Sequence, residues 1–367
     1  MLLSEYDYNL PEDLIAQMPA DKRENSKMMV LNRKDRTISH KHFYDIVDLI
    51  ESDTLLVMNN TKVLPARLIG HKDTGAKIEV FLLKQVDDQS LENDMQDPVG
   101  WMQRLRCSYW DVLIKPSKRV SPNTIVKISD ELTVRAVKRL EDNGEWLVEL
   151  LFEGDNVLDV LHRNGNIPLP PYIERKIPND DLKKLDFERY HTVYANDEGS
   201  VAAPTAGLHF TKEILKKLQD KGVELCEVTL NVGLGTFRPV QCENVLEHKM
   251  HSESFEISEQ ASEQINRAIK EGRKIVAVGT TTVRTLETAF QKFGCIKPCH
   301  DSSELFIYPP YEFKVVDNLI TNFHLPKSTL LMLVSALAGK DFIFEAYKEA
   351  IENKYRFFSY GDCMYIE

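Results

Sequence analysis

Hydrophobic positions in the second half of the chain alternate between helical and strand spacing. Ile214, Leu215 and Leu218 fall at helical spacing after Thr211, and Gly222 is placed to end this helix. The pattern then predicts a strand over 223–230, a helix over 258–272, a strand over 275–278, a helix after 279, a strand over 305–308 and a buried apolar helix over 328–338. Helices and strands that alternate in this way are typical of an α/β domain.

A different pattern covers residues 63–152, where short alternating or β-branched segments follow one another without an amphipathic helix. The predicted strands lie at 77–81, 124–128, 132–137 and 146–152, with turn signals such as Ser121-Pro122-Asn123 between them. Such strands favour a small antiparallel barrel or sandwich. Residues 1–60 hold one predicted strand, at 55–58, so we expect them to join the second half.

These patterns predict a mixed α/β protein in which a larger α/β domain carries an inserted small antiparallel β-barrel domain. The larger domain is expected to comprise residues 1–62 plus 155–367, and the barrel residues 63–154. A length of 367 residues agrees with two domains, at about 150 residues for each. The polar, acidic segment 85–100 is expected to be a mobile loop.

The composition is that of a folded globular chain, with 43% hydrophobic and 28% charged residues. The N-terminus lacks the basic and apolar regions of a secretory signal, and no apolar run approaches the roughly 20 residues that span a bilayer. Six scattered cysteines indicate reduced thiols, so we expect a cytoplasmic protein. The net charge of -11 argues against a generally basic surface, although a local patch could still bind nucleic acid.

Four segments of the α/β half carry residues suited to a ligand. Ser200 to Thr211, SVAAPTAGLHFT, places small residues and a histidine directly before a helix, so its backbone could approach a ligand closely; a tight structural turn is the alternative. Residues 279–284 occupy a strand-to-helix junction, where open α/β sheets collect ligands. Residues 59–62 and 321–326 are polar clusters that turns could equally explain. The first segment is the strongest candidate for an active-site wall.

Two other groups of residues suggest metal or RNA binding. Residues 248–251 and 295–300 contain histidine and cysteine but lack paired CxxC or HExxH spacing, so no metal site is expected. Arg163, Arg175 and Lys176 flank the extended aromatic stretch 167–172, a combination that suits RNA and is as often solvated surface. Residues 115–119 form a second basic candidate.

Nine segments between residues 6 and 362 are distinctive when taken together: YDYNLPEDLIA, NNTKVLPARL, GNIPLPPYIER, SVAAPTAGLHFT, VGLGTFRPV, MHSE, VAVGTTTVRTLE, LITNFHLPKSTLLMLVSA and YRFFSYGD. In this order they resemble the S-adenosylmethionine:tRNA ribosyltransferase-isomerases of queuosine biosynthesis. The chain departs from that family's pattern at His191, Asn231 and Pro310, where glutamine, histidine and glycine are usual. The roles of these three positions are therefore open.

The resemblance implies an enzyme that transfers and isomerises the ribosyl part of S-adenosylmethionine onto 7-aminomethyl-7-deazaguanine in a tRNA anticodon. The products would be epoxyqueuosine-tRNA, adenine and methionine, so S-adenosylmethionine would be consumed as a substrate. We expect a monomer. The alternatives are a tRNA-binding protein without catalysis and an RNA methyltransferase.

The implied reaction needs a base, because the sulfonium acidifies the ribose carbon bonded to sulfur. The candidate bases are His209, His251, His324 and Asp362. The residues expected to hold the nucleoside and the carboxylate of the methionine part are Asn60, Thr61, Thr205, Gly207, Thr281 and Arg284. The tRNA is expected to contact Arg163, Arg175 and Lys176.

Overall fold

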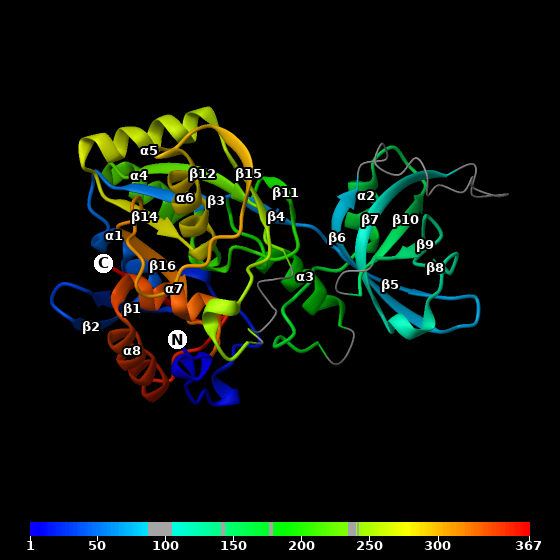
Figure 1. Cartoon of the computed structure of the whole chain (residues 1–367), viewed down its shortest axis with the longest axis horizontal. Coiled ribbons are helices and arrows are strands. Elements are labelled where there is room, and N and C mark those ends of the chain that lie inside the picture. The colour runs from blue at the N-terminus through cyan, green and yellow to red at the C-terminus, as the bar shows by residue number, and fades with distance from the viewer. Residues whose placement is uncertain (87–104, 141–143, 176–178, 234–239, 241) are drawn as a thin grey trace. The chain divides into compact units, whose positions relative to one another are not determined.

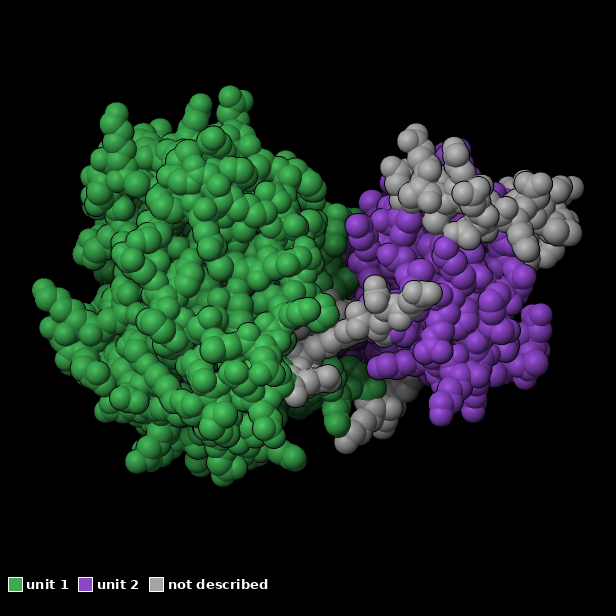
Figure 2. All heavy atoms as spheres, in the orientation of Figure 1, with its two compact units in different colours: residues 1–62, 170–178, 188–367 green, residues 63–169, 179–187 purple. Residues whose placement is uncertain are grey.

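The chain forms two compact units (Figure 2). The structure is a computed structural model that describes residues 1–86, 105–140, 144–175, 179–233, 240 and 242–367. Unit 1 comprises Met1–Lys62, Pro170–Pro178 and Glu188–Glu367, and unit 2 comprises Val63–Leu169 and Asn179–Phe187. Unit 2 begins where the sequence predicts the insertion to begin. It extends past the predicted exit at residue 154, because residues 155–169 and 179–187 group with it.

Unit 1 is built on a nine-stranded mixed sheet in the order β15-β13-β12-β3-β14-β16-β17-β1-β2 (Figure 1). Its strands are β1 (Lys27–Asn32), β2 (Thr37–His42), β3 (Leu55–Asn59), β12 (Glu224–Leu230), β13 (Glu253–Ile257), β14 (Ile275–Val278), β15 (Cys299–Ser303), β16 (Asn318–Asn322) and β17 (Cys363–Ile366). The four central strands β12, β3, β14 and β16 run parallel to one another. Their carboxyl ends therefore meet at one edge of the sheet.

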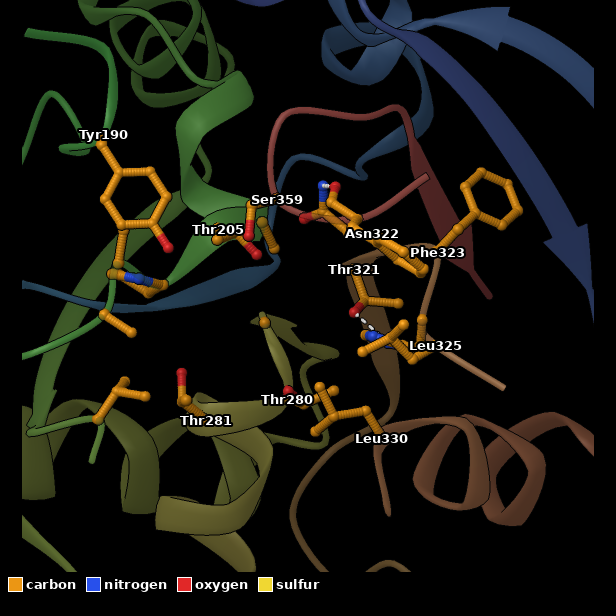
Figure 3. Close-up of a pocket in the computed structure, with 18 of the residues that line it drawn as sticks. Tyr190, Thr205, Thr280, Thr281, Thr321, Asn322, Phe323, Leu325, Leu330 and Ser359 are labelled. Atoms are coloured by element: carbon orange, nitrogen blue, oxygen red, sulfur yellow. Dashed lines mark hydrogen bonds between the residues drawn. The ribbon is translucent and has the colours of Figure 1, made fainter. Parts of the chain in front are cut away.

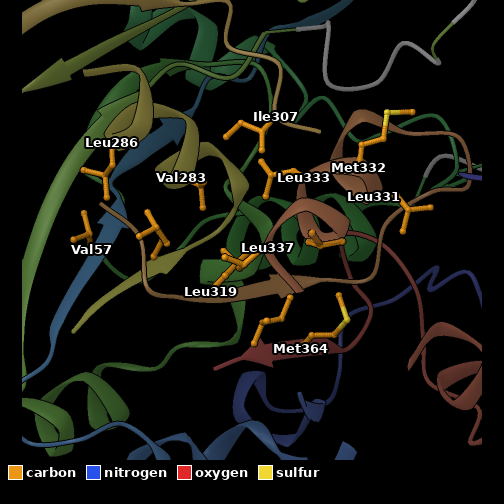
Figure 4. Close-up of a cluster of buried hydrophobic side chains, with 14 of the residues drawn as sticks. Val57, Val283, Leu286, Ile307, Leu319, Leu331, Met332, Leu333, Leu337 and Met364 are labelled. Carbon is orange, nitrogen blue, oxygen red and sulfur yellow. The ribbon is translucent and has the colours of Figure 1, made fainter. Parts of the chain in front are cut away.

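Helices cover both faces of this sheet because its central strands are apolar on both sides. In β3, Leu55 and Val57 pack into one hydrophobic cluster, and Leu56 and Met58 pack into another on the opposite face. Figure 4 shows part of the first cluster, where Val57 and Leu319 of the sheet face side chains of the covering helices. This burial on both faces is typical of parallel strands in three-layer α/β domains.

The helices of unit 1 begin and end at residues suited to those positions. They are α1 (Ile46–Leu49), α4 (Lys212–Lys221), α5 (Glu259–Glu271), α6 (Thr280–Phe293), α7 (Thr329–Ala338) and α8 (Lys340–Glu352). The Thr211 side chain accepts a hydrogen bond from the amide of Ile214, and Gly222 ends α4 with a φ of 102°. The predicted boundaries of this helix are confirmed.

One predicted strand is wrong, and several elements near the chain ends were not predicted. Residues 305–308 form no strand; the strand in this region is β15, which begins at the polar sequence Cys299-His300-Asp301. Apolar content misled the prediction here, since edge strands can be polar. The sheet is also extended by β17, β1 and β2: β17 pairs with β16, β1 pairs with β17 across more than 300 residues of sequence, and β2 pairs with β1.

Unit 2 contains a closed antiparallel barrel in the order β10-β7-β6-β5-β8-β9. Its strands are β5 (Arg67–His71), β6 (Lys77–Val86), β7 (Arg106–Lys115), β8 (Ile125–Lys127), β9 (Leu132–Arg139) and β10 (Trp146–Phe152), and its helix is α2 (Val157–Asn164). Further described elements of the chain are the helix α3 (Asp180–Arg189) and a separate two-stranded sheet of β4 (Thr61–Val63) and β11 (Asp197–Ser200). The barrel predicted from the sequence is confirmed, and the sandwich alternative is excluded. The predicted mobile loop at 85–100 falls mostly outside the described residues.

The barrel encloses one ion pair that is almost completely buried. Glu149 of β10 accepts hydrogen bonds from the Tyr109 hydroxyl, at 3.0 Å, and from Nε of Arg135, at 2.6 Å. The Glu149 side chain is 1% exposed, so its carboxylate oxygens rely on these partners for hydrogen bonds. By contrast, Arg67 and Glu79 form a bidentate pair that is open to solvent.

Replacement of Glu149 by alanine should destabilise the barrel by about 3 to 5 kcal/mol, because it removes the carboxylate that pairs with the buried Arg135 guanidinium. The control Glu79→Ala should cost no more than about 1 kcal/mol. Tryptophan fluorescence during urea unfolding measures both, since the chain's three tryptophans all lie between residues 101 and 146. Equal losses in the two variants would contradict a structural role for the buried pair.

Candidate functional site

A cavity of about 90 Å³ in unit 1 lies at the edge of the sheet where the parallel strands end. Its walls come from residues 202–206, 279–281, 321–325 and 358–359, together with Tyr172, Tyr190, Val232 and Leu330. Figure 3 shows Thr205, Thr281 and Asn322 around this space. Segments that are far apart in the sequence therefore meet in one site.

The segment Ser200 to Thr211 forms one wall and is fixed by the neighbouring strand end. The Ser200 hydroxyl accepts a hydrogen bond of 2.7 Å from the amide of Val232, and the Val201 amide donates to the Val232 carbonyl. Residues Thr205–His209 then form a short 3-10 helix, and Thr205 lines the cavity. The segment is thus both a tight turn and a cavity wall, so the two alternatives left by the sequence are compatible.

Gly207 has a packing role within this wall. A Cβ atom at Gly207 would lie 2.1 Å from the Tyr194 hydroxyl oxygen and 2.7 Å from Cγ2 of Thr192. Only glycine can fit at this position without moving Tyr194. Gly207 does not line the cavity, although the sequence placed it among the binding residues.

The N-terminus of α6 forms a second wall. Gly279 precedes this helix with a φ of 87°, a conformation that favours glycine, and its amide donates to the Ile320 carbonyl of β16. Gly279, Thr280 and Thr281 line the cavity. The Thr281 hydroxyl accepts a hydrogen bond of 3.3 Å from Nδ2 of the Asn59 side chain, at the last residue of β3. The positive end of the helix dipole and two hydroxyl groups therefore face the cavity.

Asn322 brings an unused hydrogen-bond acceptor to the cavity. Its Nδ2 group lies within hydrogen-bond distance of the Phe358 carbonyl, at 3.0 Å, and of Nε2 of His209, at 3.3 Å. Because a carbonyl can only accept a hydrogen bond, the contact with Phe358 assigns the nitrogen and oxygen positions of the Asn322 side-chain amide. The Asn322 side chain is buried, and its Oδ1 atom has no hydrogen-bond partner among the described residues. A bound molecule with an N–H or O–H group could supply that partner.

Two of the four candidate bases lie at or next to the cavity. His324 lines it and shares a hydrogen bond of 3.0 Å with the Thr321 hydroxyl, while His209 lies behind Asn322. Burial lowers the pKa of His324 to about 3. Burial, followed by the positive charges of Arg356 and Arg23, lowers the pKa of His209 to about 3. Both imidazoles are therefore neutral near pH 7.

The other two candidate bases are placed differently. Asp362 is buried, and its carboxylate accepts hydrogen bonds from the amides of Lys27 and Arg356 and from the Arg356 guanidinium. It holds the turn that carries Ser359 and does not line the cavity. His251 is exposed and lies outside the cavity. The geometry thus favours His324 and His209.

Arg284 is occupied by a buried ion pair rather than directed at the cavity. Its guanidinium contacts the Glu253 carboxylate and donates to the carbonyls of Ser303 and Leu305 at 3.2 Å each. Glu253 also accepts a hydrogen bond from the Gly233 amide. The arginine therefore ties α6 to the ends of β13 and β15, and it is not among the cavity residues.

Asn60 and Thr61 support the strand ends without lining the cavity. Asn60 contacts Glu227 and Thr229, and the Thr61 hydroxyl donates to Oδ1 of Asn231 at 2.9 Å. Asn231, where the family usually has histidine, is thus a partner of Thr61. Of the six predicted binding residues, Thr205 and Thr281 line the cavity.

The predicted basic strip is divided between the two units. Arg163 belongs to unit 2 and forms an ion pair with Glu131, while Arg175 belongs to unit 1 and donates to the Gln17 carbonyl. Lys176 lies outside the described residues. The structure therefore does not bring the three residues together within one compact unit.

Most of the cavity residues were not among the predicted site residues, and examples are Tyr172, Tyr190, Asn322 and Ser359. The Tyr172 and Ser359 hydroxyls are hydrogen-bonded at 2.7 Å, which joins residues 187 positions apart. Tyr172 lies in the segment GNIPLPPYIER and Ser359 in YRFFSYGD, two of the nine distinctive segments. These segments were the signal that could have identified both residues.

Within the described residues, no group of three histidine, cysteine, aspartate or glutamate side chains is arranged to hold a metal ion. None of the helices among the same residues has the length and apolar character needed to cross a membrane.

The lowered pKa of His324 predicts how stability depends on pH. Below an ordinary value near 6.5, unfolded His324 binds a proton that the folded protein excludes, so unfolding becomes easier as pH falls. Replacement of His324 by asparagine removes this contribution. The difference in unfolding free energy between wild type and variant should therefore shrink by about 2 kcal/mol between pH 7 and pH 5.

Urea unfolding at the two pH values measures this effect. The control His300→Asn removes a largely exposed histidine and shows the effect of losing an imidazole that is not buried. A His324→Asn difference that stays constant between the two pH values would show that the folded protein protonates His324 normally.

Comparisons with known proteins agree over the whole chain. Residues 3–366 match the family described as queuosine biosynthesis protein. The S-adenosylmethionine:tRNA ribosyltransferase-isomerase of Sulfurihydrogenibium sp. is 49% identical, and that of Thermosipho melanesiensis is 48% identical, each with 100% of both chains covered. The chain also matches a crystal structure of S-adenosylmethionine tRNA ribosyltransferase from Thermotoga maritima, with 36% sequence identity and a TM-score of 0.53. This match covers 99% of the present chain and 100% of the Thermotoga maritima chain. The chain therefore belongs to the queuosine biosynthesis protein family.

Proposed function

We propose that this protein is an S-adenosylmethionine:tRNA ribosyltransferase-isomerase that uses the cavity of unit 1 as its S-adenosylmethionine site. The observation that carries this proposal is the composition of the cavity wall. Residues 202–206, 279–281, 321–325 and 358–359 each lie within one of the nine distinctive segments, and together they line one space. The substrates are S-adenosylmethionine and a tRNA with 7-aminomethyl-7-deazaguanine in its anticodon. The products are epoxyqueuosine-tRNA, adenine and methionine.

The polar groups of the cavity suit a nucleoside. The unpaired Oδ1 atom of Asn322 accepts an N–H or O–H group of the substrate, and the Thr205 and Thr281 hydroxyls offer further hydrogen bonds. Tyr172 and Phe358 add aromatic surface to the wall. Asn60, Thr61, Gly207 and Arg284 support this wall from behind through the contacts described above.

We assign the initial proton abstraction to His324. It is the only one of the four candidate bases whose side chain belongs to the cavity wall, and its imidazole is neutral near pH 7. The proton removed is on the ribose carbon bonded to the sulfonium, where the positive sulfur stabilises the resulting negative charge. His209 acts through Asn322, because it accepts the hydrogen bond that holds the Asn322 amide in place.

Release of adenine tests the reaction itself. Incubation with S-adenosylmethionine and tRNA carrying 7-aminomethyl-7-deazaguanine should yield adenine and methionine, measured by liquid chromatography, and tRNA with guanine at that position should yield neither. Methylated RNA with S-adenosylhomocysteine would instead indicate a methyltransferase. Tight tRNA binding without adenine release would indicate a binding protein.

Replacement of His324 by alanine should lower kcat for adenine release by about 10²- to 10⁴-fold, the usual contribution of a general base. The KM for S-adenosylmethionine should change by much less, because the base acts in the transition state. His300→Ala alters an exposed side chain outside the cavity and is the control. Near-normal kcat in a folded His324→Ala protein, together with loss of activity in His209→Ala, would contradict this assignment and identify His209 as the base that removes the proton.

A further inference from the structure

A second hollow in unit 1 lies beside the cavity and contains two arginines. It is lined by Pro19, Ala20, Arg23, Ser26, Arg189, Leu208, His209, Ser359, Tyr360 and Gly361, and we call it the arginine hollow. Ser359 lines both spaces. His209, which lines the hollow, is hydrogen-bonded to Asn322 of the cavity wall. The two spaces are therefore separated by the thickness of these side chains.

The two guanidinium groups are held in place by main-chain carbonyls. Arg23 donates to the carbonyls of Leu208, at 3.0 Å, and Glu188, at 3.0 Å. Arg189 donates to the carbonyls of Ala20, at 2.7 Å, and Asp21, at 3.2 Å. These bonds orient both side chains but do not neutralise them, since a carbonyl carries no net charge.

The positive charge of the hollow lacks a partner of opposite sign. No carboxylate among the described residues lies within ion-pair distance of Arg23 or Arg189, and Nε of Arg189 is buried without a hydrogen-bond partner. Burial, and next the charge of Arg189, lower the pKa of Arg23, and the nearby Glu188 only partly opposes this. Two like charges this close are unfavourable unless a bound anion offsets them.

We propose that the arginine hollow binds an oxyanion of a substrate. The planar guanidinium group matches carboxylate and phosphate oxygens, and the Nε–H of Arg189 supplies a donor that no group among the described residues uses. Two substrates of the proposed reaction carry such a group, so this inference rests on the proposed function. One source is the carboxylate of the methionine part of S-adenosylmethionine, for which Arg284 is not available. The other is a backbone phosphate of the tRNA.

Charge-removing variants of the two arginines distinguish these sources. Arg23→Gln and Arg189→Gln are compared with the control Arg267→Gln. Arg267 is an exposed arginine of α5 that lines neither the hollow nor the cavity. If the hollow binds the carboxylate, the KM for S-adenosylmethionine should rise about tenfold or more. If it binds a phosphate, the KM for tRNA should rise instead. The number of counterions released on tRNA binding, measured from the slope of log affinity against log salt concentration, should then fall by about one. Arg189→Lys should recover part of either loss.

Values of both KM within twofold of wild type in folded variants would overturn the proposal. Should the glutamine variants fail to fold, phenylglyoxal labelling of the wild-type protein with peptide mapping decides the question. S-adenosylmethionine or tRNA should protect Arg23 and Arg189 and leave Arg267 unprotected. Labelling that neither substrate reduces, or an absence of labelling at Arg23 and Arg189 in the free protein, would also overturn it. Failure of the wild-type chain to release adenine would refute the proposed function instead, and the labelling would still report on the hollow.

Discussion

The parallel pairing of β12, β3, β14 and β16 is the constraint on which the rest of the site depends. Parallel strands place their carboxyl ends at one edge, so the residues that follow each strand must share that edge. Asn59, Val232, Gly279 and Asn322 reach the site for this reason and not through any closeness in sequence. The burial of this sheet on both faces supplies the rigidity that a site made from four separate segments requires.

Buried polar groups around the cavity divide into those that are satisfied within the protein and those that are not. Arg284 with Glu253, and Asp362 with Arg356, are complete within the protein and therefore hold segments in position. Oδ1 of Asn322 and Nε of Arg189 are buried without partners among the described residues. Such groups cost free energy in the empty protein, and a ligand that pairs with them recovers it.

Much of the fold could be predicted from the sequence because its signals are local. Thr211 caps a helix with its own side chain, Gly222 ends it, and buried and partly exposed positions alternate within β6 of the barrel. The role of Arg284 could not be predicted, because its partner Glu253 lies 31 positions earlier, on a strand that reaches it only through the sheet. Ser359 is a similar case, since its contact with Tyr172 exists only in the folded chain.

The location of the S-adenosylmethionine site is the central claim, and a crystal structure with S-adenosylhomocysteine tests it most directly. This analogue lacks the sulfonium charge and so cannot react. The account predicts that its nucleoside occupies the cavity of unit 1, with an N–H or O–H group within hydrogen-bond distance of Oδ1 of Asn322. A nucleoside bound elsewhere, with the cavity unchanged, would contradict it.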